Sequence, residues 1–208
     1  MSEKGLFITL EGIEGVGKTT NMDFVHKQLL AAGKEVVLTR EPGGTSLGED
    51  IRNLLLGHKH DGMSSETELL LMFAARAEHL SKVIVPAVMD GKYVLCDRFT
   101  DATFAYQGGG RGIPTRRIQE LEQWVQGNMR PDMTLLLDLP VEVGLERAGK
   151  RSAADRFEKE NMVFFQRVRD RYLQLADEFP HRFRVIDASQ ALDVVQQQIK
   201  DVLQEILK

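Results

Sequence analysis

The chain has 208 residues, of which 42% are hydrophobic and 28% are charged, and its formal net charge is −4. This length suits one well-buried domain, residues 1–208, and the composition is that of a folded protein rather than a disordered one. The acidic balance argues against a general polyanion binder, so we expect no nucleic-acid partner.

Short apolar segments alternate with longer amphipathic ones along the chain. This pattern is typical of the α/β class, here a five-stranded, mainly parallel sheet with helices on both faces. Strands are predicted at residues 6–11, 35–39, 93–97, 133–138 and 182–187. Helices are predicted at residues 19–32, 47–56, 66–89, 100–107, 115–125, 141–147, 157–178 and 189–207, with Pro86 marking a bend or an early end of the third.

The first predicted strand runs directly into a phosphate-binding sequence. Residues 12–19 match the complete G-x-x-x-x-G-K-[ST] pattern of a P-loop. In such a loop the backbone N–H groups point at phosphate oxygens, the lysine reaches the β- and γ-phosphates, and the hydroxyl ligates Mg²⁺. The sequence therefore predicts an ATP site with Mg²⁺, formed by Gly12, Ile13, Glu14, Gly15, Val16, Gly17, Lys18 and Thr19.

Charged residues follow several of the other predicted strands. Ligands of an open parallel sheet bind beyond the carboxyl ends of its strands, so these charges are candidates for the same site. Asp97 is placed as a Walker-B-like carboxylate would be, as a ligand of Mg²⁺ either directly or through water, with Asp138 as its rival. Either aspartate is also suited to capping a helix. Arg98 needs an anionic partner, and a bound phosphate is a natural one.

Two further segments suggest either local structure or ligand contact. The run of glycines at residues 108–110 is expected to stop the helix before it, and it either turns the chain or lets the backbone approach a ligand. Residues 149–155 carry no large apolar side chain, which suggests a lid covering about residues 147–157. The cations in or beside it are either surface charges or arginine fingers; they are Arg147, Lys150, Arg151 and Arg156.

Other residues with reactive or metal-binding side chains are expected either to pack in the core or to have no specific role. Cys96, the single cysteine, lies in an apolar run and is predicted to be an inert core thiol. Trp124 is predicted to belong to the core. The five histidines show no metal-ligand spacing, so no role is assigned to them. Without an apolar run of about 18 residues or a signal-type N-terminus, the protein is expected to be cytoplasmic, with no membrane partner.

Six segments in order resemble the thymidylate kinase family, the P-loop nucleoside-monophosphate kinases that make dTDP from dTMP. The resemblance runs almost from end to end and is carried by residues 11–20, 39–45, 73–76, 97–99, 105–112 and 155–158. It implies a P-loop nucleoside-monophosphate kinase architecture. It also implies transfer of the ATP γ-phosphoryl group to dTMP in dTTP biosynthesis, with ATP and dTMP as substrates, and a homodimer joined through helices.

The resemblance also implies roles for individual residues. Glu14 corresponds to a carboxylate placed for the sugar 3′-hydroxyl, and Arg98 to the cation on the acceptor 5′-phosphate. The predicted contacts to the rest of dTMP are Phe73, Arg76, Thr103, Tyr106 and Gln107. Of these, Arg76 and Thr103 match positions that read the thymine edge, and Tyr106 matches the residue that crowds a ribose 2′-hydroxyl. Lys18, Arg98, Arg151 and Arg156 are the predicted catalytic residues.

The chain departs from the family pattern in one position and follows one of its two subtypes in another. Relatives commonly stack thymine on an aromatic four residues before the equivalent of Arg76, but that position is Met72 and the aromatic is Phe73. Either the helix is rotated or Met72 covers the base. Gly15 stands where some relatives carry a catalytic arginine, which indicates the bacterial type with arginines in the lid.

A nucleotide switch that controls a partner is the alternative from another functional class. Such a module binds GTP or ATP without an acceptor. The chain contains no N-K-x-D string for reading guanine, which argues against this alternative. ADP release that depends on an added monophosphate would exclude it.

Overall fold

The structure, a computed structural model, describes residues 5–57, 59, 62–149, 156–157 and 160–207. Within these residues five strands form one sheet in the order β2-β3-β1-β4-β5, and every neighbouring pair is parallel. The strands are β1 (Phe7–Glu11), β2 (Val36–Arg40), β3 (Tyr93–Asp97), β4 (Met133–Asp138) and β5 (Phe183–Asp187). Each begins and ends within one residue of its predicted bounds, so the parallel α/β architecture is confirmed.

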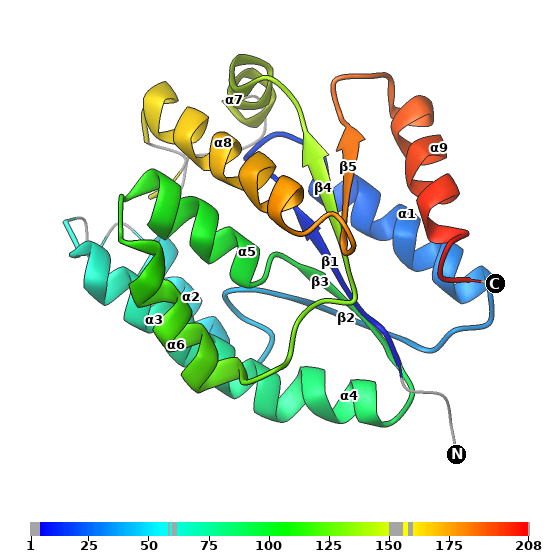
Figure 1. The fold of residues 1–208 in the computed structure, drawn as a ribbon, viewed down its shortest axis with the longest axis horizontal. Coiled ribbons are helices and arrows are strands. Elements are labelled where there is room, and N and C mark those ends of the chain that lie inside the picture. The colour runs from blue at the N-terminus through cyan, green and yellow to red at the C-terminus, as the bar shows by residue number, and fades with distance from the viewer. Residues whose placement is uncertain (1–4, 58, 60–61, 150–155, 158–159, 208) are drawn as a thin grey trace.

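Helices cover both faces of this sheet, as Figure 1 shows. On one face lie α1 (Lys18–Ala31) and α9 (Leu192–Leu203), which contact each other. On the other face α4 (Val85–Met89) packs on β3, and α8 (Met162–Glu178) packs on β4 and β5. The central strand β1 is buried along its whole length, because helices exclude water from both of its sides.

Four further helices belong to the described residues. They are α2 (Ser46–Leu56), α3 (Ser65–His79), α6 (Thr115–Gln126) and α7 (Val141–Gly149). The helix predicted from residue 157 begins instead at Met162, because the Asn161 side chain accepts a hydrogen bond from Phe164 N at 2.9 Å and caps the first turn. That hydrogen bond fixes the beginning of α8.

The helix predicted over residues 66–89 passes through Pro86 instead of ending there. A π-helical segment, η2 (Leu80–Ile84), joins α3 to α4. Proline lacks an N–H group and its ring collides with the carbonyl four residues earlier in a regular α-helix. The wider π-helical turn just before Pro86 changes the hydrogen-bonding pattern at that point, so the chain continues as a helix to Met89.

The prediction that glycines 108–110 stop a helix is wrong. The short helix α5 (Thr100–Thr103) continues into a second π-helical segment, η3 (Phe104–Gly110), which contains all three glycines. A Cβ atom on Gly110 would lie 2.4 Å from the Phe164 ring, and one on Gly109 would lie 2.7 Å from the Arg167 carbonyl oxygen. The glycines therefore allow η3 to lie directly against α8, a packing reason that neither sequence interpretation contained.

Trp124 contradicts its predicted place in the core, because 83% of its surface is exposed on α6. Cys96 is fully buried in β3, as predicted, and its thiol donates to the Arg98 carbonyl oxygen at 3.0 Å.

Among the described residues, the helices are all too short or too polar to span a bilayer.

Candidate functional site

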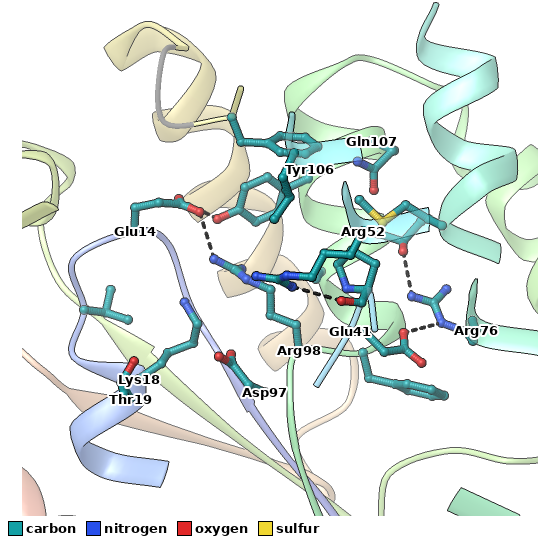
Figure 2. A pocket seen from close by; sticks show the side chains of 18 of the residues that line it. Glu14, Lys18, Thr19, Glu41, Arg52, Arg76, Asp97, Arg98, Tyr106 and Gln107 are labelled. Carbon is teal, nitrogen blue, oxygen red and sulfur yellow. Dashed lines mark hydrogen bonds and ion pairs between the residues drawn. The ribbon is translucent and has the colours of Figure 1, made fainter. Parts of the chain in front are cut away.

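One pocket lies beyond the carboxyl ends of β1 and β3, between the P-loop and helices α2, α3 and η3 (Figure 2). An open parallel sheet is expected to hold its ligand at this edge. The lining residues are Glu14, Gly15, Val16, Gly17, Lys18, Thr19, Glu41, Pro42, Arg52, Leu56, Met72, Arg76, Asp97, Arg98, Phe99, Ala102, Thr103, Tyr106, Gln107 and Phe157. Predicted nucleotide and acceptor residues therefore share one pocket.

The P-loop side of the pocket follows from the geometry of residues 12–19. Lys18 is the first residue of α1, and its Nζ lies 3.4 Å from the carbonyl oxygens of Gly12 and Ile13. Burial lowers the pKa of Lys18, and the nearby Arg98 charge lowers it further. Anionic phosphate oxygens at this position would favour the charged ammonium group.

Gly15 has φ of +75°, and a Cβ atom there would lie 1.9 Å from the Gly144 carbonyl oxygen. The α7 backbone thus excludes any side chain from position 15. The P-loop of this chain consequently has no room for an arginine at that position.

Arg98 is held at the centre of the pocket by a network of hydrogen bonds. Its Nη2 donates to Glu14 Oε1 at 2.9 Å, and its Nη1 donates to Gly12 O at 2.9 Å and to Tyr172 Oη at 3.2 Å. Tyr106 Oη donates to the second Glu14 oxygen at 2.6 Å. Arg98 also has φ of +67°, a rare conformation for a residue with a side chain. The network and this backbone conformation together aim the guanidinium group into the pocket.

The buried side chains of Glu11 and Tyr172 lie behind Arg98 and fix the peptide group between Arg98 and Phe99. The Glu11 carboxylate accepts Phe99 N and Tyr172 Oη, each at 2.7 Å. Burial, followed by the Asp101 charge, raises the pKa of Glu11 to about 8. Burial opposes the charge on Arg98, yet Tyr106 and Glu14 raise its pKa well above the usual value. Arg98 therefore remains a cation at neutral pH.

Asp97 ends β3 in the pocket, and its Oδ1 is buried without a hydrogen-bond partner among the described residues. A buried carboxylate oxygen without a donor is costly unless a cation is its partner. Thr19 lines the same pocket, so hard oxygen ligands of the kind that Mg²⁺ prefers are available there. These donors fit the predicted metal. The rival residue Asp138 lies outside the pocket lining and forms a two-pronged ion pair with Arg169 at 2.7 and 2.8 Å.

The opposite side of the pocket is built around Arg76, whose side chain is only 2% exposed. Its Nε donates to Glu41 Oε2 at 2.8 Å, and its Nη2 donates to Thr103 Oγ1 at 2.9 Å (Figure 2). Its Nη1 has no partner among the described residues, although it is buried. Gln107 also lines the pocket, with its Nε2 donating to Glu68 Oε1 at 2.8 Å.

The structure separates the two candidates for covering the base. Met72 lines the pocket, whereas Phe73 is buried and is not part of the pocket lining. The Phe73 ring lies 4.8 Å from the Arg76 guanidinium carbon and packs on it. Phe73 therefore supports the arginine instead of lining the pocket, and the alternative in which Met72 covers the base stays a prediction.

The lid residues are only partly described. Lys150 and Arg151 lie outside the described residues. Arg156 pairs with Glu68, donates to Leu55 O at 2.8 Å, and is not part of the pocket lining.

Arg147 likewise stays away from the pocket. Its Nη1 donates to the Ala188 carbonyl oxygen at 3.1 Å, beyond the end of β5. The described structure thus brings neither Arg147 nor Arg156 to the P-loop, and their predicted contacts to phosphate stay predictions.

Several pocket residues were not identified from the sequence. Arg52 lines the pocket and donates to Pro42 O at 2.9 Å, adding a cation near Arg98 (Figure 2). An arginine beside the apolar residues of a short helix was its only signal. Behind Arg76, and outside the pocket lining, His79 Nδ1 lies 3.0 Å from Glu41 Oε1. Glu41 follows the second predicted strand and lies in the segment 39–45 that carries the family resemblance, but the sequence assigned it no role.

Comparisons with known proteins agree with one another. The family profile described as Thymidylate kinase matches residues 10–199. Thymidylate kinase of Pseudomonas syringae pv. tomato is 59% identical over 204 residues, covering 98% of this chain and 97% of the relative, and that of Ectopseudomonas mendocina is 58% identical with the same coverage. The crystal structure of thymidylate kinase from Ehrlichia chaffeensis matches with a TM-score of 0.78 and 39% identity, covering 97% of this chain and 99% of that one.

Proposed function

The chain belongs to the thymidylate kinase family, and from this premise we propose how its pocket divides the work of the reaction. The protein is an ATP-dependent nucleoside-monophosphate kinase that transfers the γ-phosphoryl group of ATP to dTMP, giving dTDP and ADP. The observation that carries the assignment of roles is the shared pocket, which has the P-loop on one side and Arg76 on the other. The donor phosphates of ATP and the acceptor phosphate of dTMP can therefore lie next to each other in this pocket.

The reaction is an in-line displacement. An oxygen of the dTMP phosphate forms a bond to the γ-phosphorus, while the bond to the bridging oxygen breaks and leaves its electron pair on ADP. The attacking oxygen is already an anion, so no strong general base is needed, and the enzyme contributes position and positive charge. Lys18 supplies charge to the donor phosphates in this proposal. Arg98 and Arg52 supply charge to the acceptor phosphate.

Mg²⁺ belongs to the same proposal. Thr19 and Asp97 would hold it, and the unpartnered Asp97 oxygen supports this choice. Bound there, the ion would neutralise negative charge on the donor phosphates. The cytoplasmic location expected from the sequence also remains a proposal.

Acceptor selectivity tests the proposed roles of Arg76, Thr103 and Tyr106. Arg76 Nη1 is a buried donor without a partner among the described residues, so it favours a base that presents an oxygen. We expect kcat/KM for dTMP to exceed that for dCMP and for UMP by at least about a hundredfold, and that for dUMP by less. Steady-state kinetics with the four acceptors measures these ratios. Equal values for dTMP and dCMP would remove the base-reading role, and equal values for dTMP and UMP would remove the role of Tyr106.

We also propose that two copies associate through α3 and α6, which contact each other in the chain. Leu70 on α3 is 57% exposed and Trp124 on α6 is 83% exposed, although both side chains are large and apolar. The family resemblance to homodimers supports a second copy as the partner of this face. In the predicted apolar run at residues 69–73, Leu69 and Phe73 are buried in the core of the chain, whereas Leu70 lies on the proposed interface.

The oligomeric state gives a direct test. We expect sedimentation at twice the chain mass of 23.5 kDa, and Trp124→Glu should shift the protein to the single-chain mass. Met89→Glu is the control, because Met89 is 77% exposed on α4, outside α3 and α6. Trp124 is the single tryptophan, so a red shift of its fluorescence on dilution should accompany dissociation. A parent protein that sediments as one chain at micromolar concentration would contradict the proposal.

A further inference from the structure

His79, to which the sequence assigned no role, is part of a buried chain of polar contacts behind Arg76. Its Nδ1 lies 3.0 Å from Glu41 Oε1, and its Nε2 lies 2.6 Å from Thr39 Oγ1. The histidine side chain is fully buried, and the Glu41 side chain is only 4% exposed. The second Glu41 oxygen accepts Arg76 Nε at 2.8 Å. One carboxylate therefore connects His79 to the arginine in the pocket.

The partners of His79 determine which ring nitrogen carries the proton. An ionised carboxylate only accepts hydrogen bonds, so Nδ1 must be the donor to Glu41. A hydroxyl can donate, so the Thr39 Oγ1 proton satisfies Nε2 when the ring is neutral. In this arrangement both ring nitrogens are satisfied, and one Glu41 oxygen is fixed from behind.

Arg76 itself has little freedom to turn. The Phe73 and Phe99 rings lie 4.8 and 5.0 Å from its guanidinium carbon, Glu41 holds Nε, and Thr103 Oγ1 accepts Nη2 at 2.9 Å. The guanidinium group is planar, so these contacts also fix the direction of Nη1. Nη1 is the nitrogen with no partner among the described residues. A small rotation of Glu41 would redirect it.

We propose that His79 is a positioning residue for base specificity, acting through Glu41 to hold Arg76 Nη1 toward the 4-oxo group of the base. The inference rests on the proposed role of Arg76. A 4-oxo group accepts the hydrogen bond, whereas the 4-amino group of cytosine is a donor and faces another donor. Loss of the His79 contact therefore weakens binding of 4-oxo bases and leaves 4-amino bases as they were.

Two amide substitutions separate the contact to Glu41 from the volume of the histidine. The amide of asparagine reaches the place of Nδ1, so His79→Asn keeps a donor to Glu41. The amide of glutamine reaches the place of Nε2, so His79→Gln loses that donor while retaining the contact to Thr39. Calorimetric titration with dTMP, dUMP and 5-methyl-dCMP measures the effect, since 5-methyl-dCMP keeps the methyl group and exchanges the 4-oxo group for an amino group.

We expect His79→Gln to weaken dTMP and dUMP together by about tenfold and to leave 5-methyl-dCMP within about twofold. His79→Asn should bind dTMP within about threefold of the parent. If His79→Gln does not fold, Thr39→Val carries the test, because it removes the other hydrogen bond of the ring at nearly constant volume. About threefold weaker dTMP binding, with 5-methyl-dCMP unchanged, is the expected result for that variant.

Three outcomes would overturn the inference: equal loss in His79→Asn and His79→Gln, equal loss for all three ligands, or no change in dTMP binding. Arg76→Lys distinguishes this failure from failure of the proposed function. If Arg76→Lys keeps the full preference for dTMP over 5-methyl-dCMP, the role of Arg76 itself is wrong. If it removes that preference while His79→Gln does not, only the role of His79 is wrong.

Discussion

Lys18→Ala is expected to leave a folded protein whose kcat is lowered by about a thousandfold or more. Lys18 Nζ lies over the P-loop carbonyls of Gly12 and Ile13 at 3.4 Å, in the pocket that also contains Asp97. The Lys18 charge interacts most strongly with the transferring phosphoryl group in the transition state. Removing it therefore raises the transition-state barrier by about 4 kcal/mol. Thermal stability should change little, because these long contacts to carbonyls contribute little to folding.

Steady-state kinetics with saturating ATP and dTMP, together with thermal denaturation, checks this expectation. Lys27→Ala is the matched control on the same helix, because Lys27 is exposed and pairs with Asp23 at 2.6 Å one turn away. That exposed pair contributes little, so kcat and the melting temperature should stay near those of the parent. Near-normal kcat in Lys18→Ala would require the P-loop assignment to be abandoned.

The sequence was sufficient for the sheet because its strands are short apolar runs, of which β1, β3 and β4 are buried almost along their whole length. It was also sufficient for the P-loop, where the pattern specifies backbone conformation and side chains together. The π-helical segments could not be predicted in this way. Gly109 and Gly110 lie in a helix because α8 approaches within contact distance, and that approach depends on residues more than 50 positions away. Local propensity contains no information about such packing.

The same limit explains the errors at single side chains. Met72 and Phe73 are adjacent on α3, and only the packing of that helix against the rest of the fold decides which of them faces the pocket. Trp124 is exposed on an amphipathic helix. A large apolar side chain on such a helix is assigned to the core when the sequence is considered as a single chain without a partner. His79 carries no motif at all. Its connection to Glu41 appears only when β2 and α3 lie side by side.

The second large effect concerns the residues that supply positive charge to the migrating phosphoryl group. Some relatives place an arginine in the P-loop, but here the Gly144 carbonyl oxygen excludes a side chain at position 15. We propose that lid arginines supply this charge. Arg151 is the first candidate, since Arg156 is engaged with Glu68 and must leave that carboxylate to reach the pocket.

Arg151→Ala is therefore expected to lower kcat about a hundredfold while changing dTMP affinity by less than about threefold, because its contact forms in the transition state. Arg156→Ala should lower kcat by at least about tenfold and also lower the melting temperature, since it leaves the buried Glu68 with one cation fewer. Arg147→Ala is the third variant of the series, and its effect on kcat should be smaller than that of Arg151→Ala, because Arg147 is held by the Ala188 carbonyl oxygen. Steady-state kinetics and direct dTMP titration measure the three variants. If Arg151→Ala, Arg156→Ala and the double variant all keep the parent kcat, neither arginine contacts the transferring group, and Arg147 and Lys150 then need the same test.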